Sequence, residues 1–123
     1  MANPNLANVT TITGQIGQVA LSTTSATSLA SNAASSGTVL KVESIVVSNT
    51  SASTASITIN TYSAAALAGT AYAIASTIPV PANASIIITD KSTSFYLTEN
   101  TSLGATAGTA SALVVTTSWE VMS

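Results

Sequence analysis

Few residues in this 123-residue chain could do acid–base or metal chemistry. The sequence has two lysines, four acidic residues, no histidine and no cysteine. Three of these charged residues, Asp90, Lys91 and Glu99, fall in the stretch PANASIIITDKSTSFYLTEN. Without histidine or cysteine, neither a Ser-His-Asp nor a Cys-His nucleophile arrangement can be built. The catalytic chemistry left to the chain is that of paired carboxylates.

A carboxylate pair of the glycosidase kind needs two acidic groups about 5 to 10 Å apart in a cleft. The chain offers four: Glu43, Asp90, Glu99 and Glu120. Asp90 and Glu99 lie at opposite ends of a predicted strand, whose rise of about 3.3 Å per residue holds them apart. The sequence therefore predicts no catalytic residues and no enzyme, and Asp90 and Lys91 are interpreted as turn and solubility residues.

No motif indicates a bound metal or cofactor. The chain lacks an Asp-x-Asp-x-Asp calcium loop and any thiolate zinc ligand. Gly14 and Gly17, in TGQIGQ, do not form a phosphate-binding glycine motif. We therefore expect no cofactor and no metal.

Low charge is the most informative property of the composition. Charged residues make up 5% of the chain and the formal net charge is -2. Little would repel one copy from another. Either Ser, Thr and Asn side chains do all the solvation or, as we expect, much of the surface is covered by neighbours in an assembly. Two lysines cannot neutralise a run of phosphates, which argues against binding nucleic acid or an anionic membrane. The start of the chain, MANPNLANVT, lacks a basic segment followed by an apolar run, so we expect no secretion signal.

The chain repeats one arrangement, in which β-branched runs are separated by clusters of Ser, Asn, Gly, Ala or Pro. Residues 63–70 read as a loop, and Pro79 and Pro81 should end the strand before them. In the run from 38 to 48 the apolar residues change face after Ser44, which indicates either a strand covered on both sides or a bulge. The predicted strands span residues 18–24, 26–31, 38–48, 55–62, 71–78, 84–89, 94–99, 103–107 and 112–121.

The stretch from 84 to 99 is the clearest hairpin signal. Its two strands flank the four residues DKST, so Ile86 and Ile88 should pair with Phe95 and Leu97 over the core. About eight short strands without a convincing helix indicate one antiparallel β-sandwich, with jelly-roll or immunoglobulin-like connections.

Four aromatic residues could form a sugar-binding platform: Tyr62, Tyr72, Tyr96 and Trp119. Alternation along the run from 71 to 78 places Tyr72, Ile74 and Ile78 on one face, predicted to be the core face. Trp119 falls on the core face of the last strand, so packing is the better interpretation for Tyr72 and Trp119. Tyr62 and Tyr96 stay open as sugar-contacting residues.

Residues 1–15 read as an extended N-terminal arm, followed by a sandwich domain over residues 16–123. Leu6, Val9 and Ile12 recur at a spacing of three, and the threonines between them argue against a helix. These three residues are our candidates for binding a partner as a strap. The alternative is a terminus that lies along its own domain.

Four segments carry a family resemblance: MANPNLANVTTITG, ASSGTVLKVESIVVSN, AYAIASTIPVPANASIIITDKSTSFYLTENTSL and ALVVTTSWEVMS. In order, and over nearly the whole chain, they resemble small virion structural proteins of tailed bacteriophages, especially cyanophages. The resemblance lies in general pattern, with no catalytic motif. It implies a β-sandwich that decorates or cements the capsid, often as a trimer, or that sits in the tail or neck. The chain has fewer charged residues than that family leads us to expect.

The resemblance implies a decoration or cement protein that bridges major capsid protein subunits on the virion exterior and assembles in the host cytoplasm. Such a protein would stabilise the shell by binding its assembled state. A tail, neck or fibre-base component is the second hypothesis. A carbohydrate-binding module on the virion surface is the third.

Overall fold

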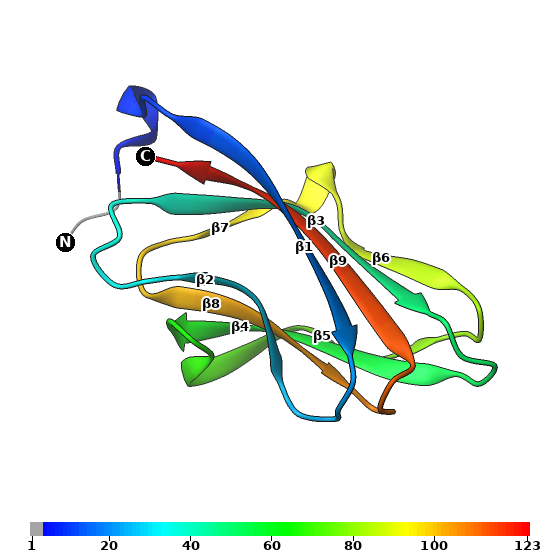
Figure 1. Cartoon of the computed structure of the whole chain (residues 1–123). Coiled ribbons are helices and arrows are strands. Elements are labelled where there is room, and N and C mark those ends of the chain that lie inside the picture. The colour runs from blue at the N-terminus through cyan, green and yellow to red at the C-terminus, as the bar shows by residue number, and fades with distance from the viewer. Residues whose placement is uncertain (1–3) are drawn as a thin grey trace.

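The computed structural model describes residues 4–123, which fold almost wholly into β-strands (Figure 1). Tight turns and two single-turn 3₁₀ helices connect the strands. The all-β prediction is therefore confirmed. In chain order the elements are η1 (Leu6–Asn8), β1 (Ile12–Leu21), β2 (Thr27–Asn32), β3 (Val39–Asn49), β4 (Ala55–Ala64), β5 (Ala68–Val80), β6 (Ser85–Thr89), η2 (Lys91–Thr93), β7 (Phe95–Leu97), β8 (Thr101–Ala107) and β9 (Leu113–Met122).

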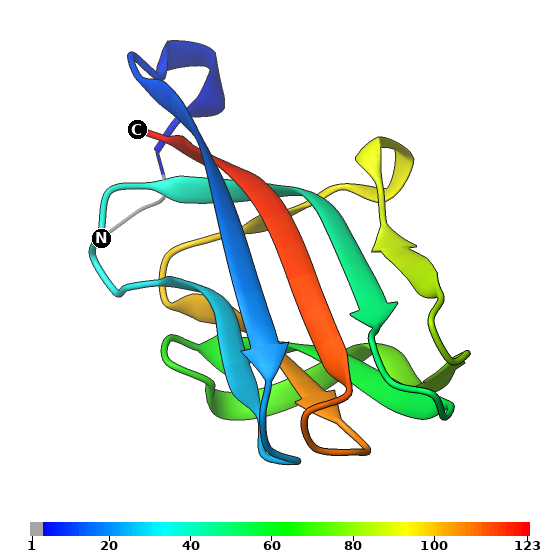
Figure 2. The same cartoon turned by 45° about the vertical axis from the view of Figure 1, so that its right-hand side comes forward.

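Two antiparallel sheets face each other as a sandwich (Figure 2). Sheet one has the order β1-β9-β3-β6, with β7 also paired to β3, and sheet two has the order β2-β8-β4-β5. The chain crosses between the sheets at almost every connection, and β4 and β5 form a hairpin within sheet two. If β6 and β7 count as one strand, this is the eight-stranded jelly roll, which decides between the two topologies that the sequence allowed.

The core fills the space between the sheets with aliphatic side chains that alternate along each strand. In β3, Leu40 and Val42 are buried, and so are Ile45 and Val47. A register shift against β9 between Val42 and Ser44 marks a bulge at Glu43, which confirms one of the two predicted alternatives. The extra residue turns Ile45 and Val47 back to the inner face, so β3 contributes to the core along its length.

The predicted hairpin over residues 84–99 is wrong. Both β6 and β7 pair antiparallel with β3, so they run in the same direction as two parts of one edge strand. Between them, Asp90 caps η2: its Oδ1 accepts from the Ser92 amide at 2.9 Å, while the Asp90 amide donates to Thr93 Oγ1 at 3.2 Å. This capping box lets the chain make one helical turn and then continue along β3 without reversing.

Two predicted strand boundaries are also corrected. Strand β5 runs through Pro79 to Val80, because it is the edge strand of sheet two and Pro79 needs no donor on its free side. Strand β1 begins at Ile12, so the last residues of the predicted arm pair with β9, from Ile12 opposite Met122 onward. Most of the predicted loop over residues 63–70 belongs to strands, because β4 ends at Ala64 and β5 begins at Ala68, with only a tight turn between them.

Candidate functional site

The three predicted strap residues lie in consecutive segments at the N-terminal end of the structure. Leu6 is exposed in η1, Val9 is half-buried beyond it, and Ile12 is exposed at the start of β1. The carbonyl of Ser123 accepts from the amides of Thr10 and Thr11 at 2.9 and 3.1 Å. This clip holds the segment against the C-terminus, while η1 itself buries no residue.

Exposed isoleucines lie on both edge strands of sheet one. Ile16 follows Ile12 on β1, and Ile87 lies on the outer face of β6, at the opposite edge of the sheet; their side chains are 64% and 67% exposed. Register places Ile16 beside Ser118 and Ile87 beside Val46, on the face that points away from the core. Sequence reasoning did not single out Ile16, which precedes the first predicted strand over residues 18–24. Nor did it single out Ile87, although the predicted core face of Ile86 and Ile88 already turns Ile87 outward by alternation.

Strand β1 is also a free edge of sheet one. It pairs with β9 over ten consecutive residues without a register shift, and no charged side chain interrupts it. A regular, uncharged edge presents unpaired backbone N–H and C=O groups to solvent, which is the arrangement that pairs with another chain. We call this edge, together with Ile12 and Ile16, the β1 surface.

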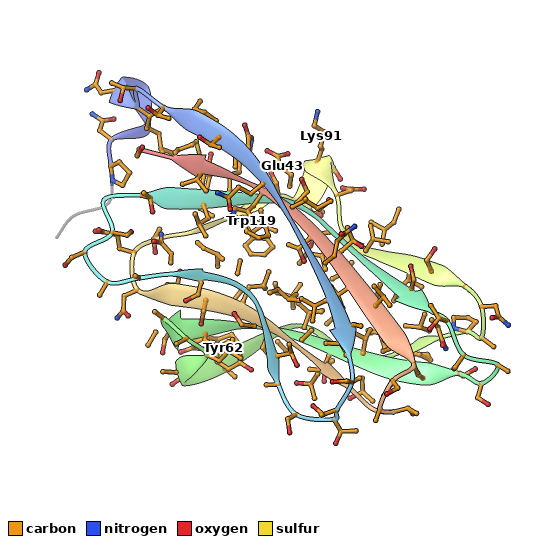
Figure 3. All side chains as sticks on the ribbon, in the orientation of Figure 1. Glu43, Tyr62, Lys91 and Trp119 are labelled. Carbon is orange, nitrogen blue, oxygen red and sulfur yellow. The ribbon has the colours of Figure 1, made fainter. Side chains whose placement is uncertain are left out.

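Most of the charge gathers on the outer face of sheet one. Lys41 and Glu43 on β3, Glu120 on β9 and Lys91 in η2 surround one shallow depression (Figure 3). Lys41 Nζ lies 3.4 Å from Glu43 Oε1, and Lys41 is the register partner of Glu120. The bulge at Glu43 is what brings its side chain beside that of Glu120.

Glu43 and Glu120 share a hydrogen bond between their side chains. This bond lowers the pKa of Glu43, with Lys41 adding to the effect, and raises the pKa of Glu120. Two carboxyl groups in hydrogen-bond contact are closer than the roughly 5 to 10 Å that glycosidase pairs require for a nucleophile or a water. The depression around them is open to solvent, so the two carboxyl groups share one proton at the protein surface.

The other two acidic residues support turns. The Ser92 side chain donates to Asp90 within η2, and this bond lowers the pKa of Asp90. Glu99 Oε2 accepts from the Gly37 amide at 2.7 Å, which ties the β2–β3 connection to the start of β8. Asp90 and Glu99 therefore perform separate structural tasks at different places.

An uncharged groove of about 700 Å³ opens between the edges of the two sheets. Strands β4 and β5 form one wall, and β6, η2 and β7 form the other. Five serine and threonine residues border it, beside three tyrosines: Thr61, Ser63, Thr89, Thr93 and Thr101. Its apolar lining comes mainly from Tyr72, Ile74, Ile88, Phe95 and Leu97.

The predicted burial of Tyr72 is wrong, although its predicted face is right. Tyr72 pairs with Thr61, which shares the inner face with buried Ile57 and Ile59. Yet Tyr72 is 60% exposed, because the facing sheet does not extend over this part of β5. The uncovered space beside Tyr72 is the groove. Ile74 and Ile78 on the same strand are exposed as well.

The predicted core position of Trp119 is confirmed. It is half-buried, packs against the core and projects between the sheets (Figure 3). A Cβ on Gly17 would lie 3.0 Å from the indole ring, so the absence of a side chain there lets β1 pass close to the tryptophan.

Tyr62 and Tyr96 do not form a shared platform. Tyr62 lies over Gly104 on the outer face of sheet two, where a Cβ on Gly104 would lie 3.2 Å from the ring. Tyr96 pairs with Lys41 on the outer face of sheet one, between the inward-facing Phe95 and Leu97. Although both residues border the groove, alternation turns their rings to different outer faces.

Among residues 4–123, no three acidic side chains gather as a group that could hold a metal ion. Nor does any helix in that part of the chain have the length and apolar character needed to cross a membrane.

Comparison with known proteins identifies the fold and no family. No family model matches the chain, and no curated protein matches it. A subunit from the structure of Bacillus endospore appendages, described as a novel family of disulfide-linked pili, aligns over 99% of this chain and 95% of its own, with 17% identity and a TM-score of 0.51. This chain has no cysteine. A chain from infectious bursal disease virus, Gx strain, aligns over 89% of this chain and 33% of its own, with 16% identity and a TM-score of 0.40.

Proposed function

We propose that this chain is a non-enzymatic structural protein of a tailed-phage virion, which decorates or cements the capsid. In this proposal it binds across neighbouring major capsid protein subunits on the outside of the shell, as a homo-oligomer with a trimer favoured. Binding to the assembled state would stabilise the shell by mass action.

The β1 surface is the observation that carries this proposal. Ile12 and Ile16 project from a regular edge whose ten residues include no charged side chain. Monomeric proteins usually blunt such edges with lysines, prolines or bulges, and β1 has none of these. Exposed apolar residues beside an open edge favour burial against another subunit, through apolar and main-chain contacts in place of salt bridges.

The N-terminal segment continues this surface and supports the strap hypothesis. Exposed Leu6 and half-buried Val9 precede Ile12, and the clip to Ser123 fixes where the segment leaves the sandwich. We infer that Leu6, Val9 and Ile12 contact the capsid partner together.

The test is co-sedimentation of the purified chain with particles assembled without it. We expect Leu6→Asp with Val9→Asp to weaken particle binding by at least tenfold, because a buried, unpaired carboxylate is costly in an apolar contact. Asn5→Asp with Asn8→Asp is the matched control, since it adds the same two charges at exposed polar positions in the same segment. Equal binding by the two variants would contradict the strap, and absence of binding by the wild-type chain would contradict the cement role.

The copy number per virion separates this proposal from the tail, neck or fibre-base alternative. A decoration protein is present in hundreds of copies per virion, a number comparable to that of the capsid subunits. A tail component is present in a few to dozens of copies. Quantitative mass spectrometry of intact particles measures the ratio.

A further inference from the structure

The groove between the two sheets combines aromatic surface with a border of hydroxyl groups. Tyr72 and Ile74 face it from sheet two, and Ile88 and Phe95 face it from sheet one. Its volume of about 700 Å³ lies in the range of small-ligand sites, roughly 300 to 1,000 Å³. We propose that this groove binds a neutral glycan, with Tyr72 and Phe95 as the stacking surfaces.

The mixed lining matches the two sides of a sugar. A pyranose ring has apolar C–H faces that pack on aromatic rings, and hydroxyls around its edge that need partners. The groove offers both. The Ser63 hydroxyl accepts from the Thr70 amide and can still donate, while the Thr61 and Thr101 hydroxyls donate to backbone carbonyls and can still accept. A purely apolar occupant would leave this remaining hydrogen-bonding capacity without partners.

The absence of charge in the lining makes the expected glycan neutral. Neither a lysine nor a carboxylate is among the described residues that line the groove. Lys41, Glu43 and Glu120 lie on the outer face of sheet one, and Asp90 Oδ1 is engaged inside η2. Phosphate, sulfate or uronate groups would thus find no cationic partner in the groove.

Strand geometry presents the two aromatic rings from opposite walls. Tyr72 shares the inner face of sheet two with Thr61, and Phe95 shares the inner face of sheet one with Val42, its register partner. Tyr72 is 60% exposed, so its ring is accessible without any rearrangement of the fold. Stacking on exposed, pre-positioned rings costs little ordering entropy.

An added protein strand is the competing occupant, and the irregularity of β5 argues against it. The register of β5 against β4 shifts between Ile57 and Ile59, between Ile59 and Asn60, and between Tyr62 and Ala64. Bulges of this kind bend an edge strand and interrupt the continuous ladder that strand addition needs. The regular edge of β1, by contrast, has no such shift.

The experiment is calorimetric titration of the full chain with neutral hexasaccharides of glucose, xylose and N-acetylglucosamine, and with oligogalacturonate of equal length. We expect binding of at least one neutral hexasaccharide and none of oligogalacturonate. Tyr72→Ala should weaken that binding about five- to tenfold, the range measured for single aromatic contacts. Ile87→Ala is the matched control, because Ile87 is 67% exposed on the outer face of β6 and is not among the described residues that line the groove. Phe95→Leu, which keeps an apolar side chain, should weaken binding while preserving the melting temperature.

Three outcomes would overturn the glycan site. One is no heat of binding with any neutral hexasaccharide at millimolar concentration. Another is binding that Ile87→Ala weakens and Tyr72→Ala leaves unchanged. The third is protection of Tyr72 from hydroxyl-radical labelling in a protein oligomer, which would show that another chain fills the groove. None of these results bears on particle binding through the β1 surface, so the glycan site and the cement role fail independently.

Discussion

At the level of single residues, each acidic side chain is tied to one local task. Asp90 caps η2, Glu99 accepts from the Gly37 amide, and Glu43 shares a hydrogen bond with Glu120. The shifted pKa values of Glu43, Asp90 and Glu120 make the stability of the fold depend on pH.

The Glu43–Glu120 pair predicts a stability maximum between the two shifted pKa values. The raised pKa of Glu120 contributes stability below its unfolded value, and this is lost as pH rises through the folded pKa. The lowered pKa of Glu43 contributes stability above its unfolded value, and this is lost as pH falls through the folded pKa. Both contributions overlap around the ordinary glutamate pKa of 4.5.

Glu120→Gln tests this assignment. The glutamine amide still donates to the Glu43 carboxylate, but it carries no charge when pH rises. We expect its melting temperature to exceed that of the wild-type chain at pH 7 to 8, and the difference to shrink toward pH 4. Glu120→Ala removes the same carboxylate without supplying a donor, so its gain at pH 7 to 8 should be smaller than that of Glu120→Gln. Parallel pH profiles for wild type and Glu120→Gln would contradict the shared proton.

At the level of elements, turns in this chain are specified by hydrogen bonds as much as by residue type. The β4–β5 turn has Ala66 and Leu67 at φ of 59°, a conformation that favours glycine or asparagine. Side chains from neighbouring strands hold it: the Ala66 amide donates to Ser31 Oγ at 3.0 Å, and the Leu67 amide donates to Ser102 Oγ at 2.9 Å. Leu67 also packs over Gly104.

Ala66→Gly should stabilise the fold by about 1 kcal/mol, because a non-glycine residue with left-handed backbone is strained by about 1 to 3 kcal/mol and glycine recovers most of it. The substitution keeps the backbone amide that donates to the Ser31 hydroxyl. Ala65→Gly is the matched control in the same turn: its φ is not positive, so it should destabilise by about 0.5–1 kcal/mol. Urea denaturation measures both, and a loss of stability in Ala66→Gly would show that the turn is not strained.

At the level of the whole molecule, the two sheets have unlike edges. Strand β5 is irregular and borders the groove, whereas β1 is regular, uncharged and carries the exposed Ile12 and Ile16. Self-association and partner binding are therefore expected through β1.

Gln18→Lys places a charge on the exposed edge strand, and Thr116→Lys places one opposite it on the paired strand β9. If copies associate through the β1 edge, we expect Gln18→Lys to raise the dissociation constant of the oligomer at least tenfold, because lysine on an edge strand obstructs strand pairing. Thr116→Lys, whose strand already has partners on both sides, should have a smaller effect. Sedimentation equilibrium measures both constants; equal effects would place the contact elsewhere, and a monomeric wild-type chain would contradict self-association.

The sequence by itself determined the all-β class, most strand positions and the use of Asp90 in a turn, and it left a bulge in β3 as one of two alternatives. These follow from local properties: β-branched runs with period two, turn residues between them, and capping chemistry within four residues. It also showed that histidine and cysteine chemistry is absent, since that is a matter of composition.

Only the tertiary structure decided how the parts meet. The pairing of both β6 and β7 with β3, the approach of Glu43 to Glu120, and the exposure of Tyr72 all depend on residues distant in sequence. Alternation assigns Tyr72 to a face, but whether that face is covered depends on where the opposing sheet ends. The groove exists for this reason. The two sheets pack face to face along most of their length but diverge at one pair of edges, and no local sequence pattern predicts where they diverge.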